Sequence, residues 1–454
     1  GSSTTGQALA AGAGANAAGA NALAFGRSAV ANGSWATATG YNANATGNYA
    51  TATGVVALAN GVNASAYGYQ ANATGGGATA LGTSATANGG AATAVGYQSI
   101  ANGAWATAAG YNANASGAYA TALGVVAQAI GADATAVGYG ANAIGTWATA
   151  TGYNANAAGN YATATGVVSV ANGVNASAFG YQANASGSNA AAFGTAASAL
   201  GDDAAAVGHL ANANGSWATA VGYNSNANGA NAVALGATAT ANGQFALAIG
   251  QNAVSNGGNA EAIGENSKAT GLNAIAIGPL ANAAGTSATA IGSYATANGA
   301  QATAIGQNAQ ANGTSAAATG DTAIANGNFA TAMGGYAKAD GIDATAFGYL
   351  ANATGLNATA MGYAALANGN QAAAFGNNAN ATGLTATALG ARALASVDTA
   401  TAVGQNAQAT ALGASAFGQG AIASIANSVA LGKGSTTSAG VNVSSATIGS
   451  TIYG

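Results

Sequence analysis

His209 is the only histidine of the chain, and it follows Asp202 and Asp203 closely. An imidazole with two carboxylates has the ligand types of a metal site. The other interpretation is three solvated turn residues, because His209 directly follows Gly208 and the chain has no cysteine. This interpretation is preferred, because no thiol, second histidine or base-nucleophile pair accompanies them. We therefore expect no catalytic residue, no metal, no cofactor and no enzymatic activity.

A second candidate set consists of tyrosines that each directly follow a glycine. Their positions differ by multiples of fourteen residues, so in a regular repeat they would form a broken column along one edge. Exposed aromatic rings can stack on glycans or on collagen, and they can equally cover the turns beneath them. Both interpretations stay open for Tyr41, Tyr69, Tyr97, Tyr111, Tyr139, Tyr153, Tyr181, Tyr223, Tyr349 and Tyr363.

Tryptophan and asparagine provide two further sets with two interpretations each. Trp35, Trp105, Trp147 and Trp217 would either pack between chains or act as platforms for a ligand. Asparagines such as Asn44, Asn114, Asn156 and Asn214 would either bind a surface or sugar, or form ladders between stacked repeats. Of these interpretations we favour interchain packing and ladders.

The element that positions all these residues is a strict glycine repeat. Glycine occupies every seventh position from Gly12 to Gly390, and the segments between read x-x-Ala-x-Ala-x. Alternation of alanine with larger residues has the period of a β-strand. A helix is disfavoured, because a glycine in every second turn would cost about 1 kcal/mol each time. The pattern therefore predicts a solenoid of very short strands.

Two kinds of heptad alternate, so the structural repeat is fourteen residues with two strands and two tight turns. The last residue of one kind is large and mostly apolar, whereas in the other kind it is mostly Asn, Thr or Ser. The alanines face a narrow interior, and the large residues form an outward row too extensive for a soluble monomer. We therefore predict association with parallel identical chains, through Phe25, Trp35, Leu81, Val95, Trp105, Trp147, Trp217, Ile291, Ile305, Met333 and Phe347.

Charge is scarce along the 454 residues. Five Lys and Arg stand against nine Asp and Glu, which gives a net charge of −4 and no basic patch for nucleic acid. No apolar run approaches the roughly 20 residues of a membrane helix, so we expect no membrane contact by this segment.

The repeat resembles the head of YadA-like trimeric autotransporter adhesins. The residues that carry the resemblance are units such as Asn273-Ala-Ile-Ala-Ile-Gly278 and Ser287-Ala-Thr-Ala-Ile-Gly292, each followed by the alanine heptad. The resemblance implies an all-β fold, a left-handed parallel β-roll with three chains side by side in a rod-like homotrimer. It also implies a location on the bacterial outer membrane and cell surface, with collagen, fibronectin, other matrix proteins or glycans as partners.

The resemblance also divides the chain. Residues 1–425 are expected to form the head repeats, and residues 426–454 a neck-like or capping segment that begins near Asn427-Ser-Val-Ala-Leu-Gly-Lys-Gly-Ser435. The leading functional hypothesis is attachment to matrix, cells or abiotic surfaces by many weak contacts. A passive spacer of a surface fibre is the alternative, and a third is ice binding through threonine pairs such as Thr37 with Thr39.

Overall fold

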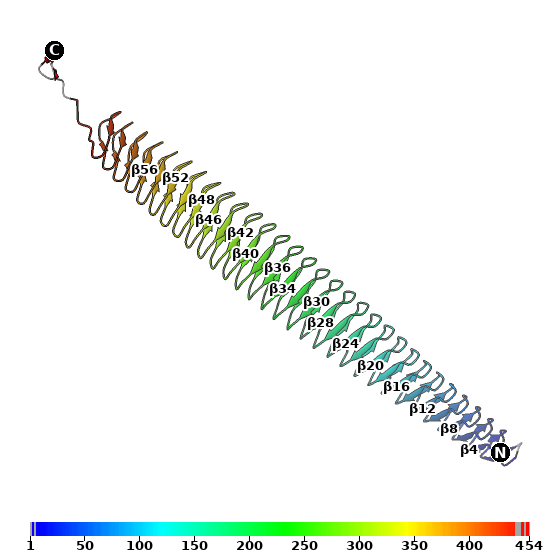
Figure 1. The fold of residues 1–454 in the computed structure, drawn as a ribbon. Helices are drawn as coiled ribbons and strands as arrows, with labels where there is room; N and C mark the ends of the chain where they lie inside the picture. Colours follow the sequence, from blue (N-terminus) through cyan, green and yellow to red (C-terminus); the bar gives the residue numbers. More distant parts are fainter. Residues whose placement is uncertain (1, 4–5, 441–445, 449–450, 454) are drawn as a thin grey trace. The chain divides into compact units, whose positions relative to one another are not determined.

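The computed structural model describes residues 2–3, 6–440, 446–448 and 451–453. It consists of two compact units, Gly1–Ala239 and Thr240–Gly454. Both are built from very short parallel β-strands in successive turns (Figure 1). The described residues contain no helix, and the chain is an all-β parallel solenoid of about 30 turns. The predicted fold class is confirmed at this level.

In the first unit, long and short strands alternate. After β1 (Ser2–Ser3), three-residue strands recur every fourteen residues from β2 (Leu9–Ala11) to β34 (Val233–Leu235) and carry the even labels. Two-residue strands recur likewise from β3 (Asn16–Ala17) to β33 (Asn226–Ala227) and carry the odd labels. Strands of one kind pair only with each other, in parallel, so the unit has a long-strand sheet and a short-strand sheet.

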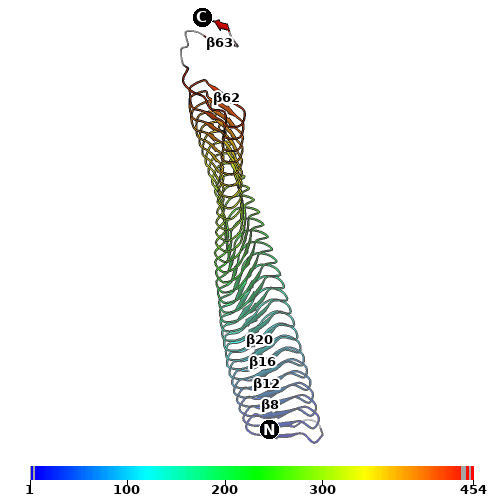
Figure 2. The same ribbon diagram turned by 60° about the vertical axis from the view of Figure 1, so that its left-hand side comes forward.

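The register keeps equivalent residues side by side. In the long-strand sheet β6 (Thr37–Thr39) pairs with β8 (Thr51–Thr53), and in the short-strand sheet β7 (Asn44–Ala45) pairs with β9 (Leu58–Ala59). Figure 2 shows how successive turns of this unit lie one beside the next from β8 to β20. A side chain at any position of the repeat therefore meets the same position one coil away.

The second unit repeats this arrangement. Its long strands run from β36 (Leu247–Ile249) to β62 (Val429–Leu431), and its short strands from β35 (Thr240–Ala241) to β61 (Ile422–Ala423). Strands β63 (Ala446–Ile448) and β64 (Thr451–Tyr453) form an antiparallel pair.

The end of the repeat lies in this second unit. β62 still pairs in register with β60 (Ser415–Phe417), and Ile422 forms a parallel bridge with Thr436. The start of the expected neck-like segment, residues 427–435, thus lies partly in the stacked coils. Of the rest of that segment, residues 441–445, 449–450 and 454 lie outside the described residues. The predicted boundary at residue 425 stays a prediction.

Alanine fills the interior of each coil. Ala36 just before β6, Ala38 within it, Ala43 just before β7 and Ala45 within it have no exposed surface, and this pattern persists through both units. The two sheets are so close that only side chains as small as those of alanine and serine occupy the space between them. Where serine replaces alanine, its hydroxyl is paired: Ser225 Oγ donates to the carbonyl of Gly222 at 3.1 Å. This bond removes the cost of a buried, unsatisfied hydroxyl.

Glycine is required at the two turns of a coil for different reasons. Before each long strand, as at Gly33, φ is not positive, but a Cβ would overlap the carbonyl oxygen of Gly47, the equivalent glycine of the next coil. Before each short strand, as at Gly40, φ is +132° and a Cβ would also overlap the next coil. Close approach of coils is therefore the common cause, and backbone conformation adds to it at one turn only.

Both turns place a non-glycine residue in the left-handed region. Ala36 N donates to Gly33 O at 3.1 Å, which closes a turn whose third residue, Trp35, has a φ of +61°. A positive φ at this position is the mark of a type II turn. Pro279 fits the same geometry, because it occupies the second position of such a turn, where its fixed φ is favoured. The sequence analysis did not predict this left-handed position.

Candidate functional site

The predicted apolar row lies on the outward face of the long-strand sheets. Its members are the last residues of long strands: Phe25 ends β4 (Leu23–Phe25) and Ile291 ends β42 (Thr289–Ile291). In the second unit the register joins Ile249, Ile263, Ile277, Ile291 and Ile305 in consecutive coils.

The row is largely uncovered in a single chain. Leu81, Met333 and Phe347 are between 42% and 48% exposed, and Val95 is half-buried. Phe179 and Phe193, on adjacent coils, stack with ring centroids 5.0 Å apart.

Where threonine replaces the large residue, at Thr39 and Thr53, the threonines extend over two coils between Phe25 and Tyr67. The threonine pairs Thr37 with Thr39 and Thr51 with Thr53 therefore occupy two adjacent coils only.

The tyrosine column forms at the turns before the short strands. Tyr97 stacks on Tyr111 and Tyr139 on Tyr153, each pair with centroids 5.2 Å apart and nearly parallel planes. Tyr349 stacks on Tyr363 at 5.6 Å. All ten tyrosines are roughly half exposed. The column therefore covers the turns and still presents ring surface to solvent, which agrees with both interpretations given to it.

Other residues complete this column where tyrosine does not recur. The Arg27 guanidinium lies 5.7 Å from the ring centroid of Tyr41, in cation–π range. Tyr336 packs edge-on against Tyr349 at 5.8 Å. The sequence analysis included neither residue, although the fourteen-residue offset from Arg27 to Tyr41 was a usable signal. Tyr69 and Tyr181 have no aromatic partner within the described part of the chain.

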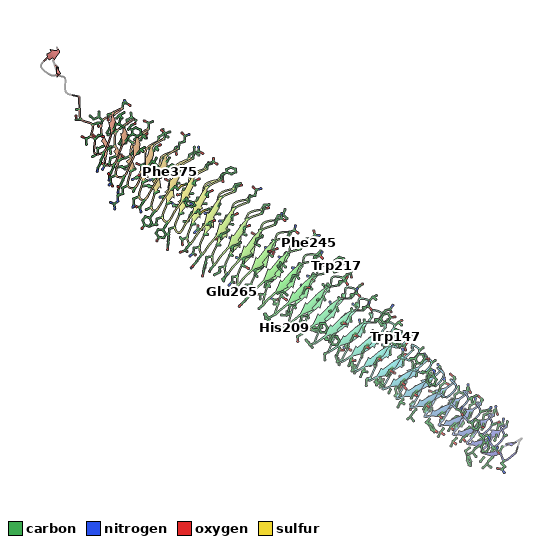
Figure 3. All side chains as sticks on the ribbon, viewed as in Figure 1. Trp147, His209, Trp217, Phe245, Glu265 and Phe375 are labelled. Atoms are coloured by element: carbon green, nitrogen blue, oxygen red, sulfur yellow. The ribbon has the colours of Figure 1, made fainter. Side chains whose placement is uncertain are left out.

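The tryptophans lie at the opposite turns. Trp35, Trp105, Trp147 and Trp217 each hold the left-handed position before a long strand and are between 55% and 63% exposed. Figure 3 shows Trp147 and Trp217 on one edge of the first unit and His209 on the other. Their predicted role at an interface between chains stays a prediction.

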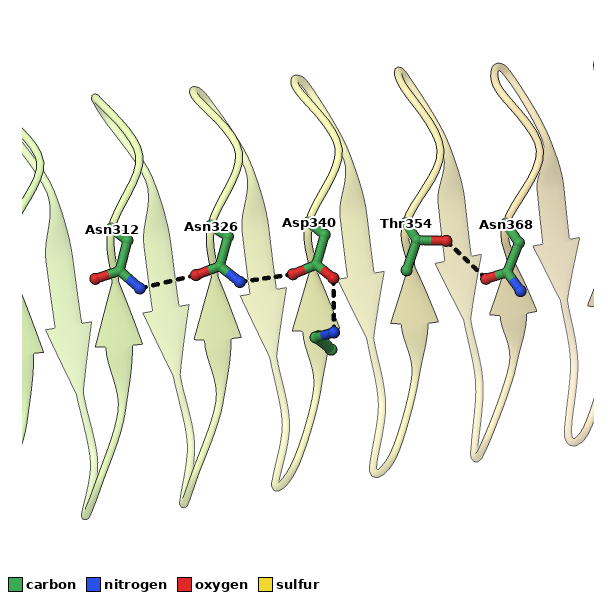
Figure 4. Close-up of polar contacts among 6 residues, drawn as sticks. Asn312, Asn326, Asp340, Thr354 and Asn368 are labelled. Atoms are coloured by element: carbon green, nitrogen blue, oxygen red, sulfur yellow. Dashed lines mark hydrogen bonds and ion pairs between the residues drawn. The ribbon is translucent and has the colours of Figure 1, made fainter.

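Asparagine side chains form ladders between coils. The ladder position is the residue after each short strand, where Asn298, Asn312, Asn326 and Asp340 are joined by bonds of 2.8, 2.8 and 2.7 Å. Figure 4 shows the part of this ladder from Asn312 to Asp340. Asp340 also forms an ion pair with Lys338 at 2.7 Å. In the first unit Asn214 bonds to Asn228 in the same way.

Of the four asparagines named from the sequence, the ladder interpretation is confirmed for Asn156 and Asn214. It is wrong for Asn114, which accepts from Ser116 of its own coil, and for Asn44, whose Oδ1 has no hydrogen-bond partner among the described residues.

His209 and the two aspartates do not form one site. His209 stacks on Tyr223 at 5.3 Å, whereas Asp202 and Asp203 accept hydrogen bonds from the preceding coil at the other turn. The residues that the structure describes contain no group of three potential metal ligands. Nor do they contain a helix long and apolar enough to cross a membrane.

A shallow open groove of about 380 Å³ crosses the outward face of the short-strand sheet in the first unit. Leu200 and Leu210 provide its apolar walls, and Asn212, Asn224 and Asn226 its amides. The sequence analysis did not foresee the groove, because its shape depends on three adjacent coils.

Comparison with known proteins agrees with this geometry. No curated protein matches the chain. The family model for the YadA head domain repeat (2 copies) matches well over half of the chain, at residues 31–56, 59–85, 101–127, 143–167, 171–197, 199–225, 218–239, 227–253, 255–281, 283–309, 325–351, 339–365, 353–379, 381–407 and 409–435. Membership implies a domain of a bacterial cell-surface autotransporter adhesin. With its paired strands and glycine turns recurring through both units, the chain belongs to the YadA head repeat family.

Proposed function

We propose that this chain is the head of a trimeric surface adhesin that attaches to matrix proteins, cells or abiotic surfaces by multivalent contact. In this proposal each chain forms left-handed coils of fourteen residues, and three parallel chains bury their apolar rows against one another. The head lies outside the bacterial outer membrane. It acts by binding and carries out no chemistry.

The observation that carries the proposal is the exposed apolar row. Isoleucine occupies it in consecutive coils from Ile249 to Ile305. A soluble monomer rarely exposes more than about 300–600 Å² of contiguous apolar surface, so a continuous apolar row of this kind is expected to be covered by a partner. Parallel, in-register copies cover it best, because each coil then meets its equivalent and the symmetry closes.

The surface left for partners comprises the short-strand sheet and its turns. It carries the tyrosine column, the asparagine ladders and the shallow groove between Leu200 and Leu210. Each contact there is small, but identical contacts recur along the chain. Repeated weak contacts raise the overall affinity by orders of magnitude without a deep pocket.

The association is tested by the solution mass of the chain, for which we expect three copies. Replacing Ile291 and Ile305 with asparagine should lower the mass toward one copy. The matched control replaces Thr296 and Gln310 on the short-strand sheet and should remain trimeric. A folded wild-type monomer would contradict the proposal.

Adhesion is tested separately, with the wild-type chain on collagen, fibronectin and bare plastic. Retention should fall when Tyr97 and Tyr111 become alanine, because both faces of a stacked pair are lost. Trimers that bind none of the three surfaces would favour a passive spacer.

A further inference from the structure

Six asparagines on the short strands stand in an Asn-Ala-Thr or Asn-Ala-Ser sequence. Residues two apart on a strand share a face, so the asparagine and the hydroxyl residue both point outward. The tripeptide is the acceptor motif for asparagine-linked glycosylation. The six asparagines are Asn44, Asn72, Asn114, Asn184, Asn352 and Asn380.

These six asparagines never occupy adjacent coils. The nearest two in each unit, Asn44 with Asn72 and Asn352 with Asn380, are separated by two coils. Coils repeat about every 4.8 Å, which leaves roughly 10 Å between neighbouring sites. Where strand asparagines do fall on successive coils, as at Asn142 and Asn156, neither is followed by Ser or Thr.

Their amide groups also differ from those of the adjacent pairs. Asn142 donates from Nδ2 to Asn156 Oδ1 at 3.2 Å, and Asn212 to Asn226 at 3.3 Å. The six isolated asparagines make no such donation in the described part of the chain. In Asn44, Asn72, Asn352 and Asn380, as also in Asn142, the Oδ1 atom is buried without a hydrogen-bond partner within the described ranges, which directs Nδ2 outward.

The two serine sites add a second feature. Ser116 Oγ donates to Asn114 Oδ1 and Ser186 Oγ to Asn184 Oδ1, each at 2.7 Å. The hydroxyl of the motif therefore contacts the amide oxygen of its own acceptor asparagine. This bond leaves the nitrogen as the free, outward end of the side chain.

We propose that these six asparagines are sites of N-glycosylation. Nδ2 attacks the anomeric carbon of a sugar that is activated through a phosphate ester, either a nucleotide sugar or a lipid-linked oligosaccharide. The new C–N bond replaces the C–O bond to phosphate, the phosphate leaves with that electron pair, and the amide loses one proton to a base of the transferase. The product is a bulky, solubilising group on the protein surface.

The folded chain is a poorer acceptor at the threonine sites than the nascent chain. Thr46 Oγ1 donates to Asn60 Oδ1 at 2.6 Å, and Thr74 bonds to Asn88 in the same way. These hydroxyls are thus committed to the ladder and turned from their own asparagines. At these two sites the nascent chain thus offers the hydroxyl more freely than the folded chain does, and the attached sugars project from the sheet opposite the apolar row.

The experiment is peptide mass mapping of the full protein purified from the surface of the bacterium that makes it, after digestion with elastase. We expect sugar mass increments at the six sites and none at Asn142 or Asn156. Asn282 is the matched internal control, because it is isolated on a short strand but followed by Ala283-Ala284. A single hexose points to a nucleotide sugar, and a longer chain to a lipid-linked donor.

A substitution pair sharpens the test. Thr46→Val should abolish modification of Asn44 while Asn72 of the same molecule keeps it, and Thr46→Ser should restore it. An unmodified intact mass, or sugar on Asn282, would overturn the proposal. Neither result depends on trimerisation or adhesion, which are measured on their own.

Discussion

Gly89 and Gly103 occupy the same turn of successive coils, so close together that a Cβ on Gly89 would overlap the Gly103 carbonyl oxygen. The adjacent Gly90 has nothing within 4 Å of its hypothetical Cβ. Two neighbouring glycines thus differ in whether a methyl group has room, and neither has a positive φ.

This contrast predicts opposite effects of the same substitution. Gly89→Ala should destabilise the stack by about 3 kcal/mol or more, because backbone must move on both coils. Gly90→Ala should be neutral or stabilising by up to about 1 kcal/mol, because it restricts the unfolded chain. Urea unfolding followed by circular dichroism compares the two variants. Equal losses would mean that the coils are not held at this spacing.

A second neighbouring pair isolates backbone strain. Val55 and Val56 are 41% and 42% exposed, but only Val56 has a positive φ, +59°. A left-handed β-branched residue costs roughly 1–2 kcal/mol. Val56→Asn should therefore raise the free energy of unfolding by about 1 kcal/mol, whereas Val55→Asn should change it by less than half as much. Thermal melts would detect the difference, and a matching gain at both positions would contradict it.

The repeat could be predicted from sequence because its causes are local. Glycine at each seventh residue, alanine at the two inward positions and a large residue at the end of most long strands fix strands, interior and outward row. The tyrosine column and asparagine ladders followed, because residues fourteen apart must meet. Each of these features depends on spacing along the chain alone.

Other features depend on backbone angles and on several coils at once. The left-handed position falls on Trp35 and Val56, residues whose types give no sign of it. Tyr336 reaches Tyr349, which is thirteen residues away and outside the repeat offset. The groove beside Leu200 and Leu210 needs three coils with different side chains, so no single repeat indicates it.

The narrow interior yields a third prediction. Ala304 has no exposed surface and faces inward on β44 (Thr303–Ile305), while Thr303 beside it faces outward. Ala304→Leu should destabilise the second unit by about 3 kcal/mol, because the sheets must separate. Thr303→Leu should cost less than about 1 kcal/mol, because an outward side chain does not push the sheets apart. Urea unfolding of both variants tests this, and tolerance of Ala304→Leu would show that the interior is wider than a methyl group requires.

The ladder around Asp340 yields a fourth prediction. Asn326 accepts from Asn312 and donates to Asp340, so Asn326→Asp removes the donor and places two carboxylates side by side. We expect a loss of about 1 kcal/mol at neutral pH, the scale of like charges on adjacent strands. Salt should reduce this loss, because these side chains are near solvent and their repulsion is screened.

Asn298→Asp provides the comparison for this prediction. The new carboxylate at position 298 faces the neutral Asn312. The variant therefore loses the same kind of hydrogen bond without placing two carboxylates side by side. Its smaller loss should hardly depend on salt. Melting temperatures of both variants at about 0.01 M and 1 M salt, where the screening length falls from about 30 to 3 Å, separate charge repulsion from the lost bond. Identical salt dependence in the two variants would contradict the prediction, because the larger loss of Asn326→Asp could then not come from repulsion between the new carboxylate and that of Asp340.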